Sequence, residues 1–306
     1  MIKLQDEGSQ SPDEGTHASP WSAFLNEATQ TFRSAGFENP ENEARRIVET
    51  ASGYSGGSLA HGLEQQATER GVAHLDAMVE RRLQHEPLQY VCGAWGFRTL
   101  DLMVDHRVLI PRPETEIVTG VALAELDKKS TKDKKLVADL GAGSGAIGLS
   151  IVAETENVEV VLTDVSSDAL QVARANLAGL GIHGTRVAIY QGSWFAALPN
   201  EYRKSFSVIV SNPPYISTSE METLPPNVRD WEPPIALASG EKGTEYLELI
   251  IDEAEEWLEH SGSLVLEMAP HHVAGISERM SSRGYADVQV FQDLSGRDRG
   301  VVGRWN

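Results

Sequence analysis

The stretch Ser207-Val-Ile-Val-Ser-Asn-Pro-Pro-Tyr215 decides the fold class of this chain. Residues 208–210 are all β-branched and too few for a helix, so they predict a short buried strand. Pro213 and Pro214 must end that strand, because proline has no N–H to donate and its φ is fixed. We therefore expect the side chain of Asn212 at the carboxyl end of a strand, where open α/β sheets bind their ligands.

Residues 212–215 carry two hydrogen-bond acceptors beside an aromatic ring. The Asn212 side-chain oxygen and the Pro213 backbone oxygen are adjacent, and a planar –NH₂ group has two hydrogens to donate to them. Tyr215 offers a face against which a flat amide or base can pack. A strand-ending turn without chemistry is the alternative, but a glycine-rich loop upstream favours a binding site.

From Lys135 onward, strand patterns alternate with helix patterns, which is typical of a mainly parallel sheet. We expect strands at residues 136–140, 158–162, 187–190, 208–210, 263–267, 288–291 and 300–305. We expect helices after residue 145, at 167–180, at 245–260 and after His272. The predicted fold class is α/β.

The loop after the first of these strands reads Gly141-Ala142-Gly143-Ser144-Gly145-Ala146, which fits the dinucleotide-binding pattern. Glycines let a ligand approach the backbone closely. Asp139 precedes the loop, and its carboxylate would repel a pyrophosphate but attract the ammonium group of an amino acid moiety. S-adenosylmethionine carries an ammonium and a sulfonium, so we predict it as the cofactor.

Two further residues follow strand ends and suit this cofactor. Asp164 ends the second strand, where acidic residues accept hydrogen bonds from ribose hydroxyls. Trp194 follows the third strand and can cover an adenine ring. The alternatives are a carboxylate at a helix start for Asp164 and an ordinary core residue for Trp194.

Composition narrows the class of protein. The chain has 306 residues, 41% of them hydrophobic, and a net charge of −19, which argues against direct binding of nucleic acid. An acidic surface favours basic protein partners instead. A single cysteine, Cys92, fits a reducing cytoplasm, and we find no apolar run of membrane-spanning length. His271 and His272 lack partners at metal-ligand spacing, so we expect a helix start there and no metal site.

Patterns upstream of the alternating region suggest three further segments. Residues 1–20 resemble a disordered acidic tail and not a signal peptide. Residues 21–86 predict a small helical domain that begins its second helix at Asn39-Pro40. Residues 87–110 are expected to form a hairpin linker, and residues 111–306 the α/β domain. Pro113 opens a helix, with Arg112 and Glu114 expected near the mouth of the cofactor site.

The glycine loop and the Asn212–Tyr215 motif together resemble class I S-adenosylmethionine-dependent methyltransferases that act on amino groups. Three other segments narrow the resemblance: Pro87-Leu-Gln-Tyr-Val-Cys-Gly93, Ile110-Pro-Arg-Pro-Glu-Thr-Glu116 and Trp231-Glu-Pro-Pro-Ile-Ala-Leu237. With a helical amino-terminal domain, the chain is similar to the peptide chain release factor N5-glutamine methyltransferases.

This resemblance implies a seven-stranded, mostly parallel Rossmann-like sheet whose last strand is antiparallel. It implies methylation of the glutamine in the Gly-Gly-Gln motif of release factors, which modulates translation termination. By the same resemblance, S-adenosylmethionine contacts Gly141, Ala142, Gly143, Ser144, Gly145, Asp164, Trp194 and Asn212, and the glutamine is held by Asn212, Pro213, Pro214 and Tyr215. Ser193 is a departure, because members of the family often have an acidic residue there.

Other functions remain as alternatives at this stage. Adenine-N6 methylation of DNA or RNA would use residues 212–215 on a flipped base, but the net charge disfavours it. A non-catalytic interaction protein would not need both motifs intact, and an oxidoreductase rests on the glycines alone. Residues 217–241 hold two Pro-Pro pairs after the motif, so we expect a substrate wall or lid there.

Overall fold

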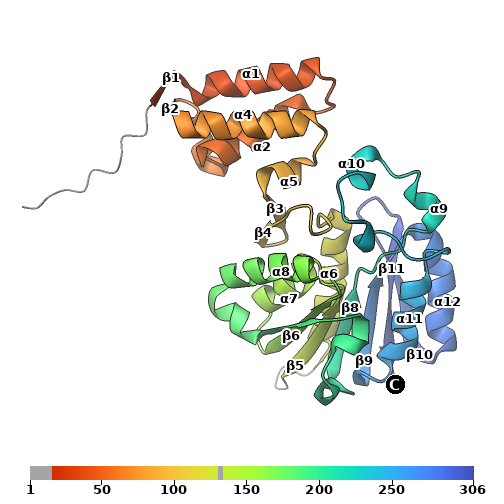
Figure 1. Ribbon diagram of the computed structural model, residues 1–306. Helices are drawn as coiled ribbons and strands as arrows, with labels where there is room; N and C mark the ends of the chain where they lie inside the picture. The colour runs from red at the N-terminus through yellow and green to blue at the C-terminus, as the bar shows by residue number, and fades with distance from the viewer. Residues whose placement is uncertain (1–15, 130–133) are drawn as a thin grey trace, which may run out of the picture. The chain divides into compact units, whose positions relative to one another are not determined.

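The computed structural model describes residues 16–129 and 134–306, which fall into two compact units divided between Cys92 and Gly93 (Figure 1). Each unit has a core of its own. The two units are therefore described separately.

The first unit is a small helical domain. Its helices enclose a core that includes Phe32, Ile47 and Met78. The second helix begins with Pro40 at its first position and acidic residues in its first turn, as predicted, although the Asn39 side chain forms no capping bond. The elements are β1 (Thr16–Pro20), α1 (Trp21–Ser34), α2 (Pro40–Ser52), η1 (Gly56–Ser58), α3 (Leu59–Gly62), β2 (Gln66–Thr68), α4 (Glu69–Leu83) and α5 (Leu88–Cys92).

The start of this unit differs from the expected disordered tail. Thr16–Pro20 forms β1, which pairs antiparallel with β2, and the Trp21 N–H continues the pairing to the Gln65 carbonyl at 3.0 Å. Three helices and a 3-10 turn separate β1 from β2 in the chain, so a local sequence pattern could not reveal that the two strands pair. The rest of the predicted tail, residues 1–15, lies outside the described residues.

The segment 87–110 also differs from a simple hairpin. The Pro87 carbonyl accepts hydrogen bonds from the N–H groups of Tyr90 and Val91 at 3.0 Å each, which closes a helical turn and starts α5. Leu88 and Val91 of α5 are buried in the core of the first unit. The hairpin itself is shorter, consists of β3 (Ala94–Phe97) and β4 (Leu100–Met103), and belongs to the second unit.

The second unit is built on a seven-stranded sheet with the order β10-β11-β9-β8-β5-β6-β7. Strand β11 runs antiparallel to its neighbours β10 and β9, and the four remaining pairs, β9-β8, β8-β5, β5-β6 and β6-β7, are parallel. This confirms the predicted sheet. The strands are β5 (Lys135–Leu140), β6 (Val158–Asp164), β7 (Val187–Gln191), β8 (Phe206–Ser211), β9 (Leu258–Glu267), β10 (Tyr285–Gln292) and β11 (Asp298–Trp305).

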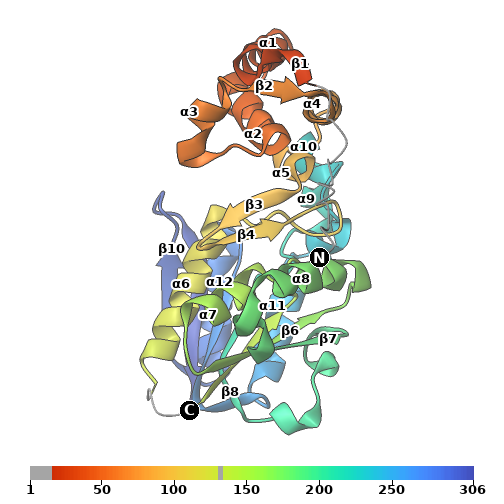
Figure 2. The ribbon, with the colours of Figure 1, turned by 90° about the vertical axis from the view of Figure 1, so that its left-hand side faces the viewer.

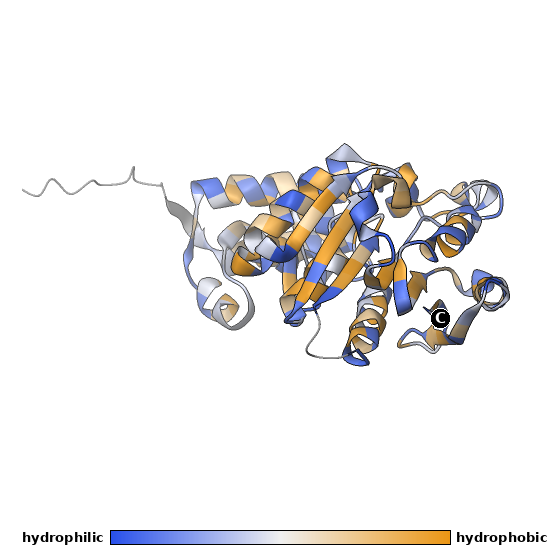
Figure 3. Cartoon of the chain, turned by 90° about the horizontal axis from the view of Figure 1, so that it is seen from below, coloured by the Kyte–Doolittle hydropathy of each residue, from blue (hydrophilic) through white to orange (hydrophobic). Residues whose placement is uncertain are grey.

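Helices cover both faces of this sheet (Figures 1 and 2), each over its own apolar core. Figure 3 shows the strands between them as mostly hydrophobic, as expected for a sheet buried on both faces. One face carries α6 (Pro113–Asp127), α7 (Ala146–Glu154) and α8 (Ser167–Gly179), and the other carries α11 (Glu245–Ala254) and α12 (Val273–Ser282). The remaining short helices are α9 (Thr218–Met221), α10 (Pro226–Arg229), η2 (Gly181–Arg186), η3 (Trp194–Ala197), η4 (Asn200–Tyr202), η5 (Pro234–Ala236) and η6 (Pro270–His272).

The helix predicted for residues 245–260 was too long. Helix α11 ends at Ala254, where the Trp257 N–H bonds to the Ala254 carbonyl at 3.0 Å and turns the chain. Leu258 then pairs with Phe206 and begins β9. Residues 255–257 in this turn include no glycine or proline, so no helix stop signal marks the end of α11.

The order of the strands reverses at β5, which lies between β6 and β8. Leu140 pairs with Ser211 at the ends of β5 and β8, so Gly141 and Asn212 both follow the same edge of the sheet. The Ser211 hydroxyl also donates to the Leu140 carbonyl at 2.7 Å. The two sequence motifs therefore meet at the switch point of the sheet, the usual ligand site of such folds.

Candidate functional site

A cavity of about 250 Å³ opens at this switch point. Most of the site residues predicted from sequence line it, namely Gly141, Ala142, Gly143, Ser144, Asp164, Trp194, Asn212 and Pro214. Gly145, Pro213 and Tyr215 are adjacent in the chain but are not among the lining residues. Arg107, Thr115 and Tyr246 line the cavity too, and the sequence analysis did not select them.

The glycine loop is held in a conformation that suits glycine. Gly141, Gly143 and Gly145 have φ values of 70°, 56° and 82°, in the left-handed region that other residues rarely adopt. The N–H groups of Gly141 and Ala142 bond to the Thr163 carbonyl at 2.8 and 2.9 Å, which ties the loop to the end of β6. Gly145 is the N-cap of α7 and does not face the cavity. The loop thus presents backbone to the cavity along residues 141–144.

Asp164 organises the loop from the neighbouring strand. Its Oδ2 accepts a hydrogen bond from the Gly143 N–H at 2.9 Å, and its Oδ1 accepts one from the Ser166 N–H at 2.8 Å. Burial raises the pKa of this carboxyl, and the backbone N–H groups of Ser166 and Gly143 oppose the rise. Each carboxylate oxygen has a second lone pair, so Asp164 retains acceptors for hydroxyl groups of a ligand.

Trp194 closes one side of the cavity. A side chain added at Gly141 would come within 3.1 Å of the Trp194 ring, so the absence of one lets the ring pack on the loop. The ring also lies against Tyr246, with centroids 5.1 Å apart. Trp194 has φ of 46°, a conformation that a bulky residue adopts rarely and that is often found at ligand sites. Its neighbour Ser193 lines the cavity as well.

Asp139 has a different position from the one expected. It is 1% exposed, does not line the cavity, and accepts a hydrogen bond from the Gly148 N–H of α7 at 2.9 Å. Gly148 has no side chain, which leaves room for the carboxylate to reach the helix backbone. Burial raises the pKa of Asp139 to about 7, although the bond from Gly148 opposes the rise. Asp139 therefore accepts a hydrogen bond from the backbone of α7 and is not placed to contact a cationic group in the cavity.

The segment 212–215 is fixed from two sides. The Asn212 Nδ2 donates to the Thr115 hydroxyl at 3.3 Å, which turns the other end of the amide away from Thr115. At Tyr215, the carbonyl accepts a hydrogen bond from the His272 Nε2 at 3.1 Å. His272 starts the segment leading into α12, as predicted, and burial lowers its pKa, which favours the neutral ring. Burial raises the pKa of the Tyr215 hydroxyl, so that hydroxyl keeps its proton.

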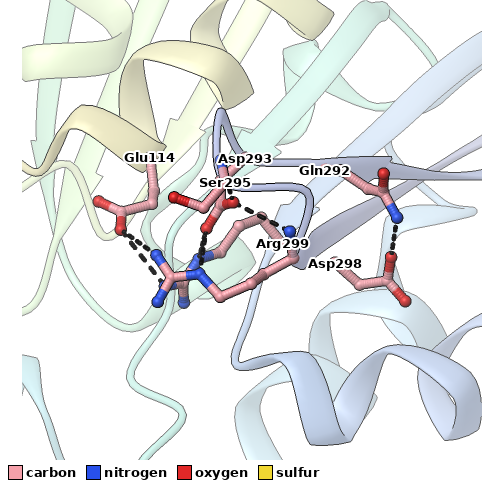
Figure 4. Close-up of polar contacts among 7 residues, drawn as sticks. Glu114, Gln292, Asp293, Ser295, Asp298 and Arg299 are labelled. Carbon is pink, nitrogen blue, oxygen red and sulfur yellow. Dashed lines mark hydrogen bonds and ion pairs between the residues drawn. The ribbon is translucent and has the colours of Figure 1, made fainter.

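Arg112 and Glu114 do not line the cavity, contrary to expectation. Glu114 lies in the first turn of α6 and pairs with Arg297 and Arg299, each at 3.3 Å. Figure 4 shows Arg299 bridging Glu114 and Asp293. Asp293 in turn accepts from the N–H groups of Ser295 and Arg297 in the turn between β10 and β11. The start of α6, and with it Thr115, is thereby fastened to the sheet.

Arg112 pairs with Glu232, which lies in the loop of residues 217–241. Glu232 is 3% exposed, and burial raises its pKa while Arg112 opposes the rise. Pro233, Ile235 and Ala236 from the same loop line the cavity. Backbone bonds such as Ile216 N–H to the Leu237 carbonyl at 3.0 Å close the base of the loop. The loop is therefore a wall of the cavity.

Comparison with known families agrees with this geometry. The family model for the Methyltransferase small domain matches residues 114–224, which include the glycine loop and the Asn212–Tyr215 motif. The model for the PrmC N-terminal domain matches residues 23–93, close to the bounds of the first unit. The hMettl16 catalytic domain, solved in complex with the MAT2A 3'UTR hairpin 6, has a TM-score of 0.52 and 12% identity over 79% of this chain and 84% of that chain. At that identity the likeness shows a shared fold.

Full-length relatives are more specific. The release factor glutamine methyltransferase of Rhodopirellula baltica is 33% identical over 291 residues, which cover 94% of this chain and 97% of that protein. The release factor glutamine methyltransferase of Geobacter sulfurreducens is 34% identical over 269 residues, which cover 88% of this chain and 91% of that protein. A bifunctional methyltransferase of Rickettsia typhi is 32% identical over 90% of this chain, which spans 55% of that longer protein.

The fold, the cavity at the switch point and the matched domain define a class I methyltransferase. Within that class, this chain belongs to the release factor glutamine methyltransferase family. Among the described residues, none of the helices has the length and hydropathy needed to span a membrane.

Proposed function

We propose that this protein transfers a methyl group from S-adenosylmethionine to the side-chain amide nitrogen of the glutamine in the Gly-Gly-Gln segment of peptide chain release factors. The observation that carries the proposal is the anchored amide of Asn212, whose Nδ2 is bound by Thr115 at the edge of the cavity. The names of the full-length relatives support the same substrate. Such an enzyme would act in the cytoplasm, where translation ends.

The residues around the cavity fit this cofactor. Gly141 and Gly143 offer backbone without side chains, and Asp164 offers carboxylate oxygens suited to ribose hydroxyls. The Trp194 ring is available to pack on an adenine. The proposed cofactor-binding set is Gly141, Ala142, Gly143, Ser144, Gly145, Asp164, Trp194 and Asn212, where Gly145 acts by shaping the loop. The bound cofactor supplies an electrophilic methyl group on a positively charged sulfur.

The proposed role of residues 212–215 is to orient the substrate amide. An amide nitrogen is a poor nucleophile, because its lone pair is delocalised into the carbonyl. Two hydrogen bonds, from the amide N–H groups to the Asn212 side-chain oxygen and the Pro213 carbonyl, would fix the nitrogen with its lone pair toward the methyl group. Pro214 would keep the motif rigid, and Tyr215 would pack on the flat amide. Orientation of this kind supplies up to about 7–11 kcal/mol in well-aligned reactions.

The helical unit that ends at Cys92 has the PrmC N-terminal domain match and lies outside the methyltransferase match. We assign it the task of positioning the release factor. The net charge of −19 suits a basic protein partner and would repel a polyphosphate backbone. Extruding a base would also cost a few kcal/mol, roughly, that an exposed glutamine does not require.

The test supplies the purified protein with methyl-labelled S-adenosylmethionine and, in separate reactions, a bacterial-type release factor, DNA or RNA. We expect label in the release factor. A matched release factor whose Gly-Gly-Gln glutamine is replaced by alanine should take up none. Label in DNA or RNA, with none in the release factor, would assign the enzyme to adenine methylation instead.

A further inference from the structure

The far end of the Asn212–Tyr215 motif is held by a contact to which the proposed function gives no task. Residues 212–215 belong to neither a helix nor a strand, because β8 ends one residue before them. Two of the four residues are prolines, which have no N–H to donate, so few hydrogen bonds can hold the motif. At its far end, the Tyr215 carbonyl accepts a hydrogen bond from the His272 Nε2 at 3.1 Å.

His272 reaches the motif from the neighbouring strand. Strand β9 lies beside β8 in the sheet, and Ser211 pairs with Leu266 near the ends of the two strands. The chain after β9 turns into η6, which ends at His272, and this side chain is 8% exposed. Neither His272 nor Tyr215 is among the residues that line the cofactor cavity. His272 can therefore act on the motif without forming a wall of that cavity.

Gly243 leaves room for this bond. Its φ is 80°, and a Cβ placed on it would lie 2.7 Å from the Tyr215 carbonyl oxygen and 2.9 Å from the His272 Nε2. Another residue would therefore press on both partners and would be strained at this φ. The Gly243 N–H bonds to the Ser239 carbonyl at 2.9 Å, which ties it to the end of the loop of residues 217–241. Segments far apart in the chain thus meet around one hydrogen bond.

The contact also decides which nitrogen of the ring carries the proton. A carbonyl oxygen can only accept, so the His272 Nε2 must donate. Burial and the nearby His271 lower the pKa of His272, which favours a neutral ring with a single ring proton. That proton is directed at the Tyr215 carbonyl, and a side chain without a donor could not replace it.

We propose that His272 is a positioning residue for methyl transfer, which holds the Tyr215 carbonyl and thereby keeps the motif aligned with the substrate amide. The other end of the motif is held by the bond from Asn212 to Thr115. A shift at Tyr215 would pass to the Pro213 carbonyl, because the proline between them is rigid. The inference rests on the function proposed above. It gives a task to one of the two histidines that the sequence alone placed at a helix start.

The first experiment compares His272→Gln with His272→Met in the full chain. The two new side chains have nearly the same length, but only glutamine has an N–H to donate. His271→Met is the matched control, because the His271 side chain is 56% exposed and its contact with Glu220, at 3.5 Å, is worth little. We expect kcat on the release factor to fall about 10–100-fold in His272→Met, as for misplaced reactive groups. It should change less than about threefold in His272→Gln and in His271→Met.

Binding of S-adenosylhomocysteine should be unchanged in these variants, because neither histidine lines the cavity. A purely structural role would lower thermal stability and leave the kcat of the folded enzyme intact. A folded His272→Met enzyme with wild-type kcat would therefore overturn the inference. A His272→Gln or His271→Met enzyme as slow as His272→Met would overturn it too. If His272→Met does not fold, His272→Leu supplies the same comparison.

A second measurement separates this inference from the proposed function. In ¹⁵N-histidine-labelled wild-type protein, the ring nitrogen resonances report which nitrogen carries the proton, and His272→Gln assigns the signal. Above its pKa, His272 should be protonated at Nε2. A wild type that methylates the release factor while His272 is protonated at Nδ1 would refute the inference alone. A wild type that leaves the release factor unlabelled would refute the proposed substrate and, with it, the role of His272.

Discussion

The carboxylate of Asp164 accepts a hydrogen bond from the backbone N–H of Gly143 at 2.9 Å. Asp164 is the last residue of β6 and Gly143 follows the adjacent strand β5, so the bond spans the edge of the sheet where the cavity opens. Asp164 therefore has two tasks, because it shapes the glycine loop and retains lone pairs for a ligand. Its replacement should affect both.

We expect Asp164→Ala to weaken binding of S-adenosylmethionine by about 1–3 kcal/mol, the usual cost of leaving buried polar partners unpaired. Calorimetric titration measures the affinity directly. Asp168→Ala is a suitable control, because Asp168 is an exposed carboxylate four residues along that does not line the cavity. Unchanged affinity in Asp164→Ala would remove Asp164 from the cofactor site.

Asn212→Ala should lower turnover by about 100-fold or more, because one of the two oxygens that orient the substrate amide is lost. The fold should survive, since Asn212 is only partly buried and its side chain makes one bond, to Thr115. Single-turnover assays and circular dichroism test the two halves of this prediction. A folded variant with near-normal turnover would rule out the orientation mechanism.

A fragment that begins at Gly93 should still bind S-adenosylmethionine, because the residues that line the cavity all belong to the second unit. Its kcat/KM on a release factor should fall at least about tenfold, equivalent to about 1.4 kcal/mol of lost binding. Steady-state kinetics on the folded fragment give the answer. Full activity would show that the helical unit contributes stability alone.

Asp139 should make stability depend on pH. Its pKa is raised from 3.8 to about 7 by burial, so the folded state holds this proton more tightly than the unfolded chain. Its contribution to stability is therefore complete below about pH 4 and is lost as the pH rises to about 7. Urea unfolding across that range should show a smaller decline for Asp139→Asn, which has no proton to lose. An identical decline in both proteins would show that Asp139 is not the source.

The strands and helices that are defined by a local sequence pattern could be predicted from sequence. The strands that end at Leu140, Asp164 and Ser211 can be recognised from their apolar runs, which are β-branched in the last two, and from the residues that follow them. Their carboxyl ends meet because parallel strands share an edge. The glycine loop, Asp164 and Asn212 could therefore be predicted to share one site, and they line one cavity.

The supporting residues could not be found in this way, because their partners are distant in sequence. Thr115 lies 97 residues from Asn212, and Arg112 lies 120 residues from Glu232. Asp139 was misplaced for a related reason, since its direction depends on the room left by Gly148. Local patterns predict which strand a residue ends, but packing between elements decides where its side chain points.

The ion pair of Arg112 and Glu232 has a consequence for how the enzyme responds to salt. Glu232 is nearly excluded from solvent while the Arg112 side chain is 34% exposed, so dissolved ions screen this pair less than they screen two charges on the surface. The attraction between an acidic protein and a basic partner acts across solvent and weakens as ionic strength rises. Higher ionic strength should therefore slow association with a basic partner and raise KM. The Arg112–Glu232 pair should stay formed and keep the wall of the cavity in place, so kcat should stay constant.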